Sequence, residues 1–82
     1  MGVKEETAEI RKLVKQHVPT VSVTMAKGTS YGWVEIEGSG KYGRFTPEEL
    51  RRLRRLGFSP AANSTGIPPS ERKKWITKLK NK

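Results

Sequence analysis

The sequence predicts an α+β fold, in which a small antiparallel sheet is packed by an N-terminal helix and two C-terminal helices. Three observations predict it. Apolar residues recur at helical spacing near both ends of the chain, whereas they alternate with polar residues in two runs between positions 20 and 37. Glycines and prolines separate these segments. We expect all the elements to share one core, in a single domain over residues 1–82.

The first predicted helix covers residues 4–17. Ile10, Leu13 and Val14 follow the spacing of one buried stripe, which His17 continues. Glutamates fall early in this segment and lysines fall late, as the helix dipole favours. Pro19 ends the helix, because the residue before a proline avoids the helical conformation.

A sheet is predicted between residues 20 and 45. β-Branched and aromatic residues alternate with polar ones in 20–26 and in 31–37, which is typical of strands. The four residues between them, 27–30, include a glycine and predict a hairpin link. We expect a short third strand over 41–45, although Gly43 weakens it.

The Arg-rich helix over 47–56 has the clearest local signal in the chain. Thr46 and Glu49 have the spacing of a capping box, and Pro47 suits the first helical position. Gly57 is placed to end the helix in the left-handed conformation.

The remaining residues predict a loop and a basic C-terminal helix. Three prolines and a glycine indicate that 58–69 is an irregular loop, attached to the core by Phe58 and Ile67. Ser70 is expected to cap the last helix, over 70–80. Its apolar face consists of Trp75, Ile76 and Leu79.

Composition excludes several classes of protein. The chain has 82 residues and no cysteine, which removes disulfides, thiolate metal sites and thiol nucleophiles. Its one histidine, His17, cannot build a multi-histidine metal site. No apolar run is long enough to span a membrane and no secretory signal is recognised, so we expect a cytoplasmic protein without membrane insertion. Many Lys, Arg and Glu residues resemble the composition of thermophile proteins.

The formal net charge of +9 belongs to the second half of the chain. Residues 1–40 hold five cations and five anions, whereas residues 41–82 hold twelve cations and three anions. Such asymmetry points to a polyanionic partner, either nucleic acid or an anionic membrane surface.

Arginines fill the side of the 47–56 helix that lies opposite its leucines. At 100° per residue no anion falls among them, and arginine suits bidentate phosphate contacts. The C-terminal helix adds lysines that suit contacts with the phosphate backbone of a nucleic acid. Two further cations, just before the Arg-rich helix, would extend this basic surface. The expected nucleic-acid-binding residues are Arg51, Arg52, Arg54, Arg55, Lys41, Arg44, Lys73, Lys74 and Lys78. A basic surface with no ligand is the alternative interpretation.

Three aromatic residues, Tyr31, Trp33 and Tyr42, are candidates for base stacking on the outer face of the sheet. Glu35 and Glu37 share that face and would repel phosphates. The alternative is that the aromatic rings pack against the core or under a loop.

Catalysis has little support in the sequence. The residues 38–41 resemble part of a phosphate loop, but Glu35 and Tyr42 stand where that motif needs glycine and Ser or Thr. We expect no enzyme activity, no metal and no cofactor, and we recognise no family.

The predicted function is non-catalytic nucleic-acid binding, with duplex DNA favoured over RNA. The alternative function is a protein–protein interaction module whose basic face binds an acidic partner. A homodimer stays open as a further association.

Overall fold

The computed structural model describes residues 2–26 and 31–82. The predicted hairpin link, 27–30, lies outside the described residues. The helices and strands, in chain order, are α1 (Val3–His17), β1 (Ser22–Met25), β2 (Val34–Glu37), α2 (Pro47–Leu56), β3 (Ser64–Ile67) and α3 (Arg72–Lys80). Two short 3₁₀ turns are η2 (Lys41–Gly43) and η3 (Pro69–Glu71).

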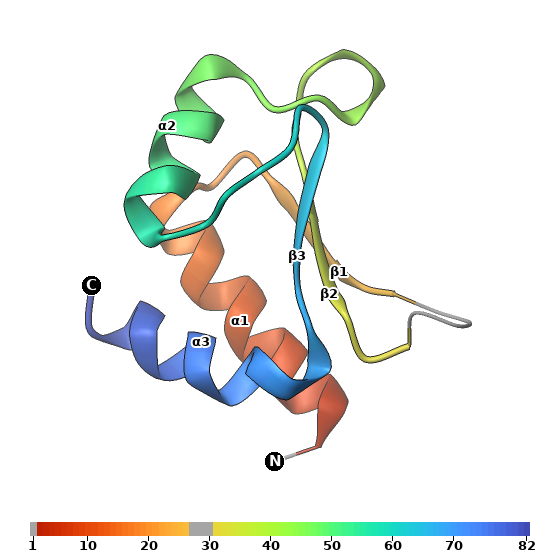
Figure 1. Cartoon of the computed structure of the whole chain (residues 1–82), viewed down its shortest axis with the longest axis vertical. Coiled ribbons are helices and arrows are strands. Elements are labelled where there is room, and N and C mark those ends of the chain that lie inside the picture. The colour runs from red at the N-terminus through yellow and green to blue at the C-terminus, as the bar shows by residue number, and fades with distance from the viewer. Residues whose placement is uncertain (1, 27–30) are drawn as a thin grey trace.

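The three strands form an antiparallel sheet in the order β1-β2-β3. Val34 and Ile36 of β2 are fully buried and alternate with the exposed Glu35 and Glu37, so one face of the strand lies in the core. Figure 1 shows that the helices of the described residues lie on one side of the sheet. The molecule measures 33 × 31 × 17 Å, and its shortest dimension suits two layers. The structure therefore confirms the predicted α+β fold.

The core lies between the helices α1, α2 and α3 and the inner face of the sheet. The predicted stripe of α1 is confirmed, since Ile10, Leu13 and Val14 are all buried. Phe58 and Ile67 are also buried and attach the segment after α2, as expected. Glu6 of α1 accepts a hydrogen bond from Arg72 of α3 at 3.0 Å, and this pair joins the two ends of the chain.

The third strand lies elsewhere than predicted. The prediction of a strand over 41–45 is wrong, because the chain turns at η2 and Tyr42 has a positive φ of 60° that no strand allows. The third strand is instead β3, inside the predicted loop over 58–69. Its sequence, Ser-Thr-Gly-Ile, does not alternate between apolar and polar residues, so it gives no local signal for a strand. The strand forms because its backbone pairs with β2.

Helix α2 begins and ends at the residues that the sequence predicted. Thr46 and Glu49 form the expected capping box. Gly57 ends the helix with φ of 105°, and its N–H bonds to the carbonyl oxygens of Leu53 and Arg54. The start of α3 differs, because Ser70 lies in η3 and the helix begins at Arg72 without a side-chain cap. Among the described residues, no helix has both the length and the apolar character that crossing a bilayer requires.

Candidate nucleic-acid interface

Helix α2 turns its leucines inward and its arginines outward. Leu53 and Leu56 are buried, and Leu50 packs against the core at its edge. The outward side chains form a surface that we call the arginine face, made of Arg51, Arg52, Arg54 and Arg55. All four are exposed, as the sequence predicted from the spacing of the leucines.

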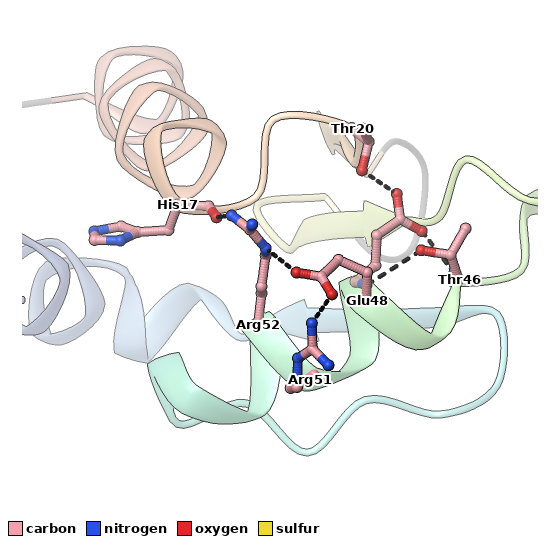
Figure 2. A network of polar contacts seen from close by, with 7 residues as sticks. His17, Thr20, Thr46, Glu48, Arg51 and Arg52 are labelled. Atoms are coloured by element: carbon pink, nitrogen blue, oxygen red, sulfur yellow. Dashed lines mark hydrogen bonds and ion pairs between the residues drawn. The ribbon is translucent and has the colours of Figure 1, made fainter.

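Two of the arginines share one carboxylate. Arg51 and Arg52 both pair with Glu48. The Nε of Arg52 lies 2.6 Å from the Oε1 of Glu48. Arg52 also donates to the backbone oxygen of His17 at 3.1 Å, and this contact links α2 to the end of α1 (Figure 2). The sequence placed no anion among the arginines, but Glu48 reaches them because residues three and four positions apart are neighbours on a helix.

Arg54 and Arg55 have no carboxylate partner within the described part of the chain. Lysines of α3 and its C-terminal extension lie beside them. Lys82 donates from its Nζ to the backbone oxygen of Arg55 at 3.3 Å. Lys78 lies over the ring of Trp75 at 4.5 Å from its centroid. That ring stacks on Phe58 at 4.0 Å, directly after α2. The cations of α3 therefore extend the arginine face at its C-terminal end.

A shallow cleft separates the end of α1 from the arginine face. Its volume is about 240 Å³, and its lining residues are His17, Glu48, Arg52, Arg55 and Leu56. Two guanidinium groups on one side of an open cleft can donate to the oxygens of a single anionic group. The cleft therefore provides a place where an exposed phosphate can approach both arginines.

Glu49 fixes the position of α2. It is only 1% exposed, and its carboxylate accepts hydrogen bonds from Thr20, Ser39 and Thr46. Burial by itself would raise the pKa of Glu49. The hydrogen bonds from Thr20, Thr46 and Ser39 outweigh burial and hold the pKa below its usual value. This one carboxylate joins the start of α2 to the segment after α1 and to the end of β2.

The other predicted cations lie in three places. Lys41 and Arg44 are exposed in the loop that precedes α2. Lys73 and Lys74 are exposed in the first turn of α3, and Lys74 lies one helical turn before Lys78. Lys82 was missed by the sequence analysis, because it follows the last periodic residue of the helix.

Some cations of the second half are committed to the fold. Arg72 is almost buried by its pair with Glu6 and also donates to the backbone oxygen of Gly32 at 2.6 Å. Lys80 pairs with Glu9 at 3.7 Å. Both pairs join α3 to α1. Arg72 is only 12% exposed and is not available to a ligand, whereas the pair of Lys80 lies at the surface.

The three candidate stacking residues are all exposed but lie in different settings. Tyr31 and Trp33 are 58% and 42% exposed, and the Trp33 ring lies against Gly66 of β3. Trp33, Glu35 and Glu37 line a shallow groove of about 420 Å³ on the open face of the sheet. Tyr42 is 84% exposed and lies in η2, in the loop that follows β2.

Within residues 2–26 and 31–82, no cluster of three or more His, Asp or Glu side chains could hold a metal ion. Comparison of the chain with models of known families, with curated proteins and with solved structures finds no match.

Proposed function

We propose that this chain is a non-catalytic nucleic-acid-binding protein, with duplex DNA as the favoured ligand. The arginine face contacts the phosphate backbone. One observation carries the proposal: Arg54 and Arg55 are exposed without a carboxylate partner among the described residues, Lys82 contacts the backbone oxygen of Arg55, and Lys78 lies at Gly57, which ends α2. These exposed cations are of the kind that contacts the phosphate backbone of nucleic acid.

The arrangement of the arginines costs stability in the absence of a ligand. Arg51 is three residues from Arg54 and four from Arg55, so like charges are neighbours on one side of α2. A row of phosphates removes this repulsion and releases condensed counterions, which is the main source of non-specific DNA affinity.

The pairs with Glu48 do not prevent such contacts. The side chains of Arg51, Arg52 and Glu48 are each about half exposed. Exposed pairs of this kind contribute roughly 0.3–0.5 kcal/mol on a helix and weaken with salt. A phosphate that makes charge-assisted hydrogen bonds can therefore replace Glu48 as the partner of Arg51.

The test compares two double variants that remove the same charge from different helices. Arg54→Gln with Arg55→Gln neutralises the arginine face, whereas Lys12→Gln with Lys15→Gln neutralises exposed side chains of α1. Affinity for a duplex oligonucleotide is measured at several salt concentrations. We expect the arginine variant to bind more weakly, with a salt slope smaller by about one unit per lost phosphate contact. The α1 variant should keep most of the wild-type slope.

Equal losses in the two variants would show that net charge alone attracts the ligand, and the arginine face would not be the contact surface. Absence of binding to every nucleic acid, with binding to an acidic polypeptide, would favour the protein-interaction alternative.

A further inference from the structure

The loop between β2 and α2, residues 38–44, has a shape fixed by its own backbone. Gly38 donates to the Gly43 oxygen at 2.9 Å, and Gly40 donates to the Arg44 oxygen at 2.8 Å. Added Cβ atoms at Gly38 and Gly40 would lie only 2.2 and 2.7 Å from that Arg44 oxygen. The close approach requires glycine at both positions. The loop therefore presents the residue at its tip, Tyr42, in one fixed place.

Tyr42 occupies a backbone conformation that suits glycine better. Its φ of 60° and ψ of 29° lie in the left-handed region, which is unfavourable for a residue with a Cβ. Its side chain is 84% exposed, so packing within the protein does not compensate for this conformation. A strained backbone with an exposed aromatic ring is explained when the ring serves an external ligand.

The charges around Tyr42 indicate the chemistry of that ligand. Lys41 and Arg44 are both exposed, and the Lys41 Nζ lies 5.3 Å from the centroid of the tyrosine ring. Glu37 of β2 approaches the loop at Gly43 and adds one negative charge. Because Lys41 and Arg44 carry two positive charges, the loop keeps an excess of positive charge. An aromatic face beside cations is the combination that stacks on a nucleobase and holds its phosphate.

The loop that carries Tyr42 leads into the first turn of α2, the helix that carries the arginine face. Three residues separate η2 from α2, and Figure 1 shows this loop and the first turn of α2 at the same end of the molecule. Trp33 is less suited to this role, because Glu35 lies beside it on the open sheet face and repels phosphates.

We propose that Tyr42 stacks on an unpaired nucleobase while the arginine face holds the adjoining phosphates. This inference rests on the proposed function and narrows its ligand to nucleic acid in which a single-stranded segment adjoins a duplex. Bases inside an intact duplex are stacked on each other and offer no free face to the tyrosine.

The experiment uses two duplexes with the same paired sequence, one blunt and one with a short overhang that contains 2-aminopurine. The wild-type chain should bind the overhang duplex more tightly and quench its fluorescence. Tyr42→Gly relieves the backbone strain, so its melting temperature should not fall. It should lose about tenfold or more in affinity for the overhang duplex, the loss that removing one base–aromatic stack produces. Its affinity for the blunt duplex should stay unchanged.

Two further variants separate the ring from other effects. Tyr42→Phe keeps the stacking face and should bind both duplexes as the wild type does. Tyr31→Ala removes another exposed aromatic residue and should also leave both affinities unchanged. A Tyr42→Gly protein that binds both duplexes normally, or that weakens equally on both, overturns the inference while the proposed function stands. A wild-type protein that binds neither duplex overturns both.

Discussion

Glu49 is the residue on which the position of the arginine face depends most directly. Its carboxylate is buried and accepts hydrogen bonds from Thr20, Ser39 and Thr46. Hydrogen bonds to a charged group are stronger than those between neutral groups, and a glutamine would present one acceptor oxygen in place of two. The loss of this carboxylate therefore loosens α2 and both segments that it joins.

We expect Glu49→Gln to lower the free energy of unfolding by about 2 kcal/mol at neutral pH. Because the pKa of Glu49 is lower in the folded protein than its usual 4.5, its stabilisation is fully present above that pH. It is lost as the pH falls through the pKa of the folded protein, so the two proteins should converge in acid. Urea denaturation across the acidic range measures this difference.

Glu48→Gln is the matched control, because it makes the same chemical change one residue earlier, at an exposed side chain. Its cost should be about 1 kcal/mol at most, because it loses two exposed pairs that contribute roughly 0.3–0.5 kcal/mol each. Equal costs for the two variants would mean that Glu49 has no special structural role.

Local spacing predicted only part of what Glu49 does. The capping box with Thr46 is readable from the sequence, because both partners lie within one turn of helix. Thr20 and Ser39 are 29 and 10 residues away, and they meet the carboxylate only when the whole fold has formed. Hydrogen bonds between distant segments leave no periodic signal in the sequence.

At the scale of elements, α3 is held by Arg72. The guanidinium group contacts Glu6 of α1 and the backbone oxygen of Gly32 before β2. One oxygen of Glu6, Oε2, is buried without a hydrogen-bond partner within the described part of the chain, so the pair with Arg72 is its main compensation. Removal of one member of a buried ion pair leaves the other charge buried and uncompensated.

Arg72→Gln should therefore destabilise the protein by about 3 kcal/mol in urea denaturation. Arg54→Gln serves as the control and should change the free energy of unfolding by less than about 0.5 kcal/mol, because its side chain is exposed without an ion partner among the described residues. Similar costs for both variants would contradict the division of the cations into structural and surface groups.

The sequence predicted the helices better than the strands. Helix α2 has both of its end signals in its own sequence, Thr46 with Glu49 and the left-handed Gly57. Strand β3 has only one buried apolar residue, Ile67, and its order depends on pairing with β2. The third strand was predicted over 41–45 because Tyr42 and Arg44 would lie on one side of a strand and Phe45 on the other. Instead, backbone hydrogen bonds of Gly38 and Gly40 close this segment into a loop.

At the scale of the whole molecule, the fold sorts the basic residues into two groups. Arg72 and Lys80 pair with glutamates of α1 and stabilise the packing of the two chain ends. The arginines of α2 pair only with Glu48 of their own helix, and Arg54 and Arg55 have no ion partner among the described residues. The charge asymmetry of the sequence predicted an excess of cations, but only the tertiary contacts divide them in this way.

The central claim is that the arginine face is the surface that contacts phosphates. The most direct measurement is a titration of the ¹⁵N-labelled chain with duplex DNA, followed by the NMR signals of backbone amides and arginine Nε groups. The account predicts the largest shifts at Arg51, Arg54 and Arg55, with further shifts at Lys78 and Lys82. Shifts confined to the open face of the sheet, around Trp33 and Glu35, or spread evenly over the molecule would contradict it.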